Sequence, residues 1–142
     1  MKKLAFLIAS AFAITSCNNS SNTNNQNDLA KTQEETMKIH DEIMPQVSVF
    51  DKDAVTIDSI LTHLKAIKTA KPALDTTQTR QELTQLKKNL EEATDHMMDW
   101  MKGYSADSTT VDYANRELTK VKDMKAVFDR VSKEKQEILN KY

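Results

Sequence analysis

The chain has 142 residues, a length that predicts one domain. It contains only 1 Gly and 2 Pro, and this scarcity excludes turn-rich all-β folds and glycine-rich nucleotide-binding loops. Charged residues make up 29% of the chain, yet the net charge is −1, so there is no basic excess for binding nucleic acid. The composition therefore favours an all-α protein without a nucleic-acid partner.

Residues 1–16 have the pattern of a secretory signal peptide. A basic start with two lysines is followed by an uncharged apolar run over residues 4–14, which is shorter than the about 20 residues that cross a bilayer. The run leads into Ile-Thr-Ser-Cys at residues 14–17, which resembles the lipobox of bacterial lipoproteins. This resemblance implies that the chain is cut before Cys17, that the Cys17 thiol is lipidated and that the new amino terminus is acylated.

The lipobox resemblance also predicts where the protein resides. Asn18 follows the cysteine, and in lipoproteins of this kind a residue other than Asp at that position directs the protein to the outer membrane. The surface-export signals of Bacteroidota lipoproteins carry acidic residues soon after the cysteine, whereas the first acidic residue here is Asp28. We therefore expect a lipid anchor on Cys17 in the cell envelope, at the outer membrane and facing the periplasm.

Residues 17–27 are expected to form the lipidated cysteine and a polar tether. Residues 18–27 contain only Asn, Ser, Thr and Gln, so they have no apolar surface to bury, and we expect a flexible tether. A flexible segment of this length has a root-mean-square reach of about 18 Å. The tether would therefore hold the remaining domain, residues 28–142, close to the membrane.

The first predicted helix covers residues 29–70. Its apolar residues recur at helical spacing and stay in register across Pro45, which favours a kink at the proline. The alternative is a full break, because Ser48 and Asp51 have the spacing that caps a new helix start. Pro72 is expected to close this segment.

Two further helices are predicted after Pro72. The second covers residues 80–102, with a capping box formed by Thr79 and Glu82 at its start and a left-handed Gly103 at its end. The third follows the sequence Thr109-x-x-Asp112 and runs to the C-terminus.

Three amphipathic helices joined by short links favour an up-down-up bundle with a Pro-kinked first helix. A two-helix protein with a detached third helix is an alternative, and a long coiled-coil dimer fits less well because the apolar stripes are wider than a two-position seam. The sequence also allows a homo-oligomer, in which the partner is a second copy of the chain. The expected core includes Ile57, Leu61, Leu83, Leu86, Leu90 and Phe128.

Five of the six methionines that follow the initiator lie in two windows, residues 37–45 and 96–101, and each window also holds a histidine. Thioether and imidazole groups are the ligands that soft ions such as Cu(I) and Ag(I) prefer. One functional hypothesis is therefore a soft-metal site between the first two helices. Its candidate ligands are His40, Met44, His96, Met97 and Met101.

The expected helix register decides which of these residues can meet. If the first two helices are antiparallel about a link near residue 73, Met44 lies beside Trp100 and Met101, and His40 lies near Tyr104. His96 then lies near Phe50, about 10 Å along the axis from His40, so a site that uses both histidines would need a shift of register.

Core packing is the competing interpretation of the same residues. Met97 and Trp100 already occupy heptad core positions, and a flexible Met side chain fills the irregular space that a proline kink leaves. No metal or cofactor is needed under this interpretation.

Enzymatic signatures are missing from the sequence. It has no HExxH or ExxH motif and no nucleophile elbow. The consecutive residues 40–42, His-Asp-Glu, point in three directions around a helix and cannot converge on one metal ion. We expect a protein that is not an enzyme and that carries no cofactor.

The lipobox, the Asn-rich segment and the sequences at residues 40–45 and 97–101 together resemble a group of small helical lipoproteins loosely labelled "viral A-type inclusion protein". The resemblance spans most of the mature chain and implies a lipoprotein without an assigned catalytic residue. The expected function is an envelope interaction or structural module with an envelope protein as its partner. The alternative is a periplasmic Cu(I) or Ag(I) binding protein.

Overall fold

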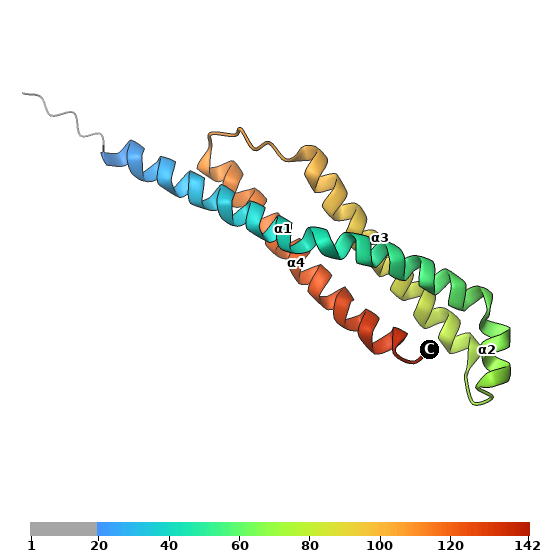
Figure 1. The fold of residues 1–142 in the computed structure, drawn as a ribbon. Helices are drawn as coiled ribbons and strands as arrows, with labels where there is room; N and C mark the ends of the chain where they lie inside the picture. The colour runs from blue at the N-terminus through green and yellow to red at the C-terminus, as the bar shows by residue number, and fades with distance from the viewer. Residues whose placement is uncertain (1–19) are drawn as a thin grey trace, which may run out of the picture.

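The computed structural model describes residues 20–142 (Figure 1). This part of the chain is all-helical and contains no strand, which confirms the predicted fold class. The predicted number of helices was wrong, because residues 20–142 form four helices where three were predicted. They are α1 (Ser20–Thr62), α2 (Leu64–Ala70), α3 (Thr76–Gly103) and α4 (Val111–Leu139).

The fourth helix arises because the predicted first helix divides at His63. Residue 63 separates α1 from α2, and its ring Nδ1 lies 2.8 Å from the backbone oxygen of Ser59. The backbone N–H of His63 still donates to the Ser59 oxygen at 3.1 Å, and that of Ile67 donates to the His63 oxygen at 3.0 Å. Helical hydrogen bonds therefore continue across the division at His63 without a loop, and periodicity alone does not reveal the division.

The start of α1 also differs from the prediction. The helix begins at Ser20, so residues 20–27 are helical where a flexible tether was expected. This segment has no Gly or Pro to stop a helix, and adding a turn to an existing helix costs far less than starting a new one. The predicted signal peptide, residues 1–16, and Cys17 lie outside the described residues.

Pro45 lies inside α1, and the helix continues through it. The alternative of a new helix start at Ser48 is therefore wrong. The Ser48 hydroxyl instead donates to the Pro45 backbone oxygen at 3.2 Å, and the Gln46 side-chain amide donates to the Glu42 oxygen at 3.4 Å. These side chains supply hydrogen bonds near the site where proline removes a backbone donor.

Two predicted caps of α3 are corrected by the structure. The N-cap is Asp75, whose carboxylate accepts from the backbone N–H groups of Thr77 and Gln78, so the Thr79 capping box is wrong. These hydrogen bonds lower the pKa of the Asp75 carboxyl. Gly103 is the last helical residue and does not have a positive φ, so a left-handed C-cap is also wrong. Helix α4 begins after Thr110, close to the predicted start.

Each of the three long helices contacts the other two. Ion pairs join Glu35 to Lys122 and Asp53 to Lys135, so residue numbers rise together along α1 and α4 and these helices are parallel. Residue numbers of α3 instead fall as those of α1 rise, as the Asp58–Lys87 pair and the contact of His40 with Trp100 show. Helix α3 is therefore antiparallel to α1, as Figure 1 also shows.

The core lies between the middle parts of the three long helices. The rings of Phe50 and Phe128 stack across α1 and α4 with centroids 4.9 Å apart, and both are buried. Of the predicted core residues, all but Leu61 are buried, and Leu61 packs half-buried against the edge. The confirmed members are Ile57, Leu83, Leu86, Leu90 and Phe128.

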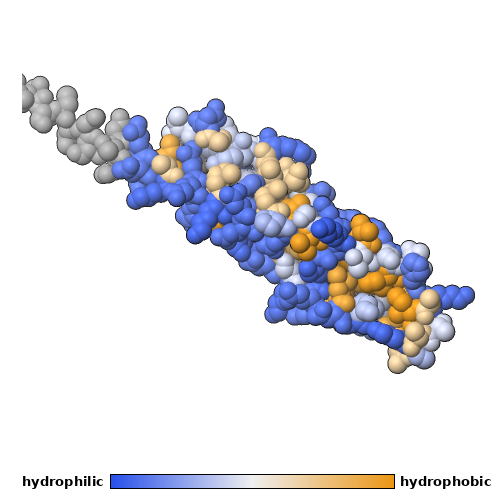
Figure 2. All heavy atoms as spheres, in the orientation of Figure 1, coloured by the Kyte–Doolittle hydropathy of each residue, from blue (hydrophilic) through white to orange (hydrophobic). Residues whose placement is uncertain are grey.

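The face of the molecule drawn in Figure 2 is mostly hydrophilic. Figure 2 shows polar side chains over most of the visible face, with apolar side chains gathered toward the end of the molecule that carries α2. Within residues 20–142, no helix combines the length and the apolar character needed to cross a membrane.

Candidate functional site

An aromatic cluster lies near the end of the molecule where α3 leads into α4. Its centre is Trp100, whose ring lies 5.8 Å from the His40 ring and 4.7 Å from the Tyr104 ring, measured between centroids. The Tyr104 ring lies 6.4 Å from that of Tyr113. Burial raises the pKa of the Tyr104 hydroxyl, and the neighbouring Tyr113 and Glu117 add to this shift. The cluster therefore joins α1, α3 and α4 at one level.

Glu117 anchors this cluster from α4. It is only 5% exposed, and its carboxylate accepts from the Trp100 indole N–H at 2.8 Å and from the Lys120 ammonium at 2.8 Å. The sequence interpretation missed this residue. A signal was present, because Glu117 follows Ala114 by three residues and precedes Val121 by four, which is the spacing of the buried stripe of α4.

The edge between α1 and α3 carries several of the candidate metal ligands. Met98 and Met101 are each 39% exposed, and Met44 packs half-buried against the core. The side chain of His40 is 13% exposed, and its Nδ1 lies 2.9 Å from the Asp41 carboxylate. We refer to the edge that Met44, Met98 and Met101 line as the methionine seam.

The other two candidate ligands lie elsewhere. Met97 is fully buried in the core. His96 is exposed and lines a cavity of about 130 Å³ on the side of α3 that faces α4, together with Met124 and Phe128. The expected proximity of His96 to Phe50 is therefore not found. His40 lies against Trp100, about one helical turn from the predicted neighbour Tyr104.

The structure thus divides the five predicted ligands. Helical spacing from the His40–Trp100 contact and the Asp58–Lys87 ion pair puts His40, Met44 and Met101 along the α1–α3 edge. Met97 is buried in the core, and His96 faces α4. Met98, which the prediction left out of the ligand set, joins the first group. Within residues 20–142, no three His, Cys, Asp or Glu side chains are gathered closely enough to hold a metal ion.

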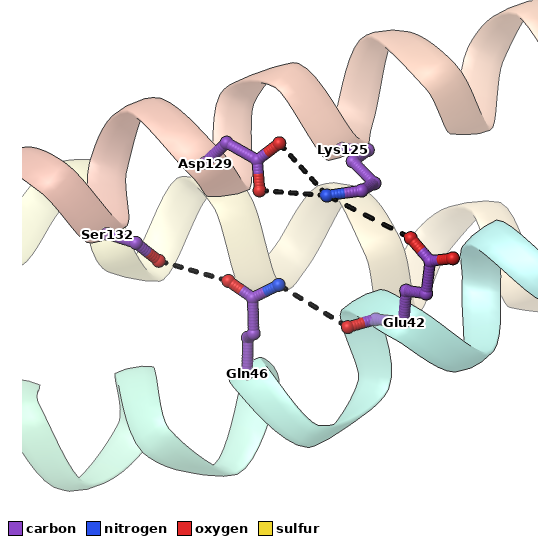
Figure 3. Close-up of polar contacts among 5 residues, drawn as sticks. All are labelled: Glu42, Gln46, Lys125, Asp129 and Ser132. Atoms are coloured by element: carbon purple, nitrogen blue, oxygen red, sulfur yellow. Dashed lines mark hydrogen bonds and ion pairs between the residues drawn. The ribbon is translucent and has the colours of Figure 1, made fainter.

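The edge between α1 and α4 is polar instead. The Lys125 ammonium lies 3.0 Å from the Asp129 carboxylate and 4.0 Å from that of Glu42, and the Ser132 hydroxyl donates to the Gln46 side-chain oxygen at 3.0 Å (Figure 3). We refer to this edge as the polar seam, which also includes the ion pairs Glu35–Lys122 and Asp53–Lys135.

No protein-family description, curated protein or solved structure matches this chain.

Proposed function

We propose that this protein is a lipid-anchored component of the bacterial envelope that acts by binding a partner rather than by catalysis. The sequence at residues 14–17 carries this proposal, because it ends a short apolar run behind a basic start and places Cys17 where lipoproteins are lipidated. Two or three acyl chains on Cys17 would give stable anchoring, whereas a single chain gives marginal anchoring. Asn18 supports a location at the outer membrane, facing the periplasm.

The arrangement of α1 supports a defined orientation at the membrane. The Gln33 side-chain amide donates to the backbone oxygens of Ala106 and Ser108 at 3.3 and 3.0 Å, so α1 passes the α3–α4 loop at that residue. The helical residues before Gln33 amount to roughly 20 Å of helix. Figure 1 shows the N-terminal end of α1 extending beyond the α3–α4 loop. An anchor at Cys17 would direct the α3–α4 loop toward the membrane and α2 away from it.

The hydrogen bonds of the buried acid Glu117 agree with a binding role. Both oxygens of Glu117, the buried acid of the aromatic cluster, are engaged by Trp100 and Lys120, so this carboxylate is held in a structural role. In this proposal α1, α3 and α4 form a bundle in which α4 runs parallel to α1 and α3 runs antiparallel to it, and α2 closes the end far from the membrane. A bundle of this kind is suited to presenting a helical surface to an envelope protein.

Lipidation is tested with Cys17→Ala and Cys17→Ser. Cells fed radiolabelled palmitate should label the parent protein, and both variants should remain unlabelled and keep residues 1–16. A variant at the neighbouring residue, Asn18→Ser, serves as the matched control and should be labelled like the parent. Normal labelling of Cys17→Ala would disprove the lipoprotein assignment.

Location is tested separately by fractionation. The parent protein should sediment with the outer membrane and resist protease added to intact cells, and it should become sensitive once the outer membrane is opened. Digestion in intact cells would place it on the cell surface instead. Asn18→Asp should move the protein to the inner membrane if the residue after the cysteine directs sorting.

A further inference from the structure

We propose that the methionine seam binds one Cu(I) or Ag(I) ion through the thioethers of Met44, Met98 and Met101 and the Nε2 atom of His40. This site goes beyond the anchoring role and does not depend on it. It differs from the ligand set that the sequence predicts, because His96 and Met97 are replaced by Met98.

Helical spacing places the α1 ligands on the side of that helix that faces α3. The Asp58 carboxylate lies 2.7 Å from the Lys87 ammonium of α3, so Asp58 marks that side. Met44 precedes Asp58 by fourteen residues and His40 precedes it by eighteen, which correspond to about four and five helical turns. Both side chains therefore lie on the same stripe as Asp58.

The same reasoning places the α3 ligands opposite. Lys87 marks the side of α3 that faces α1, and Met98 and Met101 follow it by eleven and fourteen residues, or about three and four turns. Thioethers of the two helices thus line the two sides of one edge.

Two contacts fix their levels along the helix axes. Counting from the His40–Trp100 contact, Met44 lies level with position 96, and counting from the Asp58–Lys87 pair, it lies level with Met101. Met98 and Met101 both fall in this interval of about 8 Å, which is one and a half turns. Neighbouring helix axes lie about 8–10 Å apart, a separation that two extended methionine side chains can bridge around an ion.

Core packing accounts for Met97 but not for Met98 and Met101. Met97 is fully buried, so its thioether fills space. Met98 and Met101 are instead each 39% exposed, so filling the core does not explain them. Both side chains are therefore partly open to solvent, which a site that takes up an ion requires.

His40 has the surroundings of a metal-binding imidazole. Its Nδ1 lies 2.9 Å from the Asp41 carboxylate, which directs the lone pair of Nε2 to another partner. Metal-bound histidines commonly have such a carboxylate behind them, because it fixes the tautomer and raises the basicity of the ligand. The Trp100 ring beside His40 adds a π-face that favours a cation.

The donor set selects the ion. Thioether and imidazole groups favour Cu(I) and its analogue Ag(I), whereas Zn(II) and Mg(II) prefer thiolate, imidazole or carboxylate ligands in numbers that this edge does not supply. We therefore expect binding of soft monovalent ions and none of Mg(II).

The experiment uses the full chain carrying Cys17→Ala, which removes the only thiol and makes the result independent of lipidation. Purified protein, kept reduced in mild detergent, is titrated with Cu(I) against a chromogenic chelator. Ag(I) is added in parallel to protein with ¹³C-labelled methionine methyl groups. We expect one equivalent of Cu(I) and Ag(I)-dependent shifts for the methyl groups of Met44, Met98 and Met101. The methyl groups of the buried Met97 and of Met124 on α4 should not shift.

The decisive variant replaces the three seam methionines by Leu, which conserves volume and removes the sulfur donors. It should bind Cu(I) at least 100-fold more weakly while keeping the helical circular dichroism of the parent. The matched control Met124→Leu should bind like the parent, and His40→Gln should weaken binding at least tenfold. Should the triple variant unfold, the single exposed variant Met101→Leu carries the test, with an expected loss of at least fivefold. Absence of one-equivalent binding in the parent, or equal affinity in parent and Leu variants, would overturn the proposal.

Discussion

The two edges that α1 shares with its neighbours are built from opposite chemistry. Along the polar seam, α1 and α4 meet through ion pairs and a Gln46–Ser132 hydrogen bond (Figure 3). Between α1 and α3 lie the Asp58–Lys87 ion pair and the contact of the His40 and Trp100 rings, and helical spacing places the methionine seam at the same edge. Both edges flank the same apolar core.

This difference has a physical consequence. Charged and amide groups have specific partners, so a sliding of α1 against α4 by one turn would leave several of them unpaired. Thioethers have no such requirement and tolerate small shifts. The polar seam therefore adds specific partners to the alignment that core packing sets, and the methionine seam leaves soft donor atoms without obligatory partners.

The largest expected effect comes from the core that both seams share. Phe128→Ala removes the ring stacked on Phe50 and should lower the free energy of unfolding by about 3–5 kcal/mol. Chemical denaturation followed by circular dichroism measures this loss. Val55→Ala, at an exposed position of α1, is the control and should change stability by less than about 0.5 kcal/mol. Equal effects of the two substitutions would show that the core is assigned incorrectly.

The polar seam itself is broken with Lys135→Met. The Asp53 and Lys135 side chains are only 19% and 20% exposed, so the remaining carboxylate loses its partner in a poorly solvated place, and stability should fall by about 1–3 kcal/mol. Removing both charges with Asp53→Leu and Lys135→Met should restore much of this loss.

The exposed pair of the same seam gives the matched comparison. The Glu35 and Lys122 side chains are about half exposed, and Lys122→Met should cost less than about 0.5 kcal/mol. A double-mutant cycle on each pair separates the coupling energies. If the exposed pair couples as strongly as the half-buried one, burial does not determine the strength of this seam.

A smaller loss is expected at the point where the methionine seam meets α4. Trp100→Phe keeps a ring beside His40 but removes the indole N–H that donates to Glu117. Leaving one oxygen of this buried carboxylate unpaired should cost about 1–2 kcal/mol. Adding Glu117→Gln removes the buried charge and should recover part of the loss, as thermal unfolding would show. No loss in the single variant would mean that water replaces the indole.

The smallest effect is a gain at the end of α3. Gly103 is helical without a positive φ, and an added Cβ would meet no atom within 4 Å. Gly103→Ala should raise stability by about 0.5–1 kcal/mol because it restricts the unfolded chain. The same substitution should leave Cu(I) affinity unchanged. A loss of stability would indicate that residue 103 needs the left-handed conformation that the sequence suggested.

The local chemistry of the chain predicted three long helices. The boundaries predicted for α3 and α4 lie within four residues of the observed ones. The spacing of Leu83, Leu86 and Leu90 predicted a buried stripe on α3, and these residues are buried. The sequence Thr109-x-x-Asp112 predicted the start of α4 within two residues. The division at His63 and the Asp75 cap were missed. Several residues near these helix ends have side chains that could cap a helix, and the sequence does not say which one does so.

Candidate site residues were predicted less completely. Sequence spacing put His40 and Met44 on one face of a helix, and the estimated register put Met44 opposite the second methionine window. The heptad pattern already placed Met97 in the core, where it is buried, but it did not single out Met98, which is exposed, as a candidate ligand. Adjacent residues on a helix differ by 100° in direction, so Met97 and Met98 point to different faces of α3. The rotation of the whole helix decides which of these faces is buried.

The amino-acid sequence by itself determined that this protein is helical, where its apolar stripes lie and that its only cysteine follows a lipobox-like segment, because these properties depend on residue type and local spacing. Only the tertiary structure decided that Glu117 meets Trp100 and that His96 and His40 face different helices. These contacts depend on the register and rotation of whole helices, which are set by the combined packing of many side chains and not by any single motif.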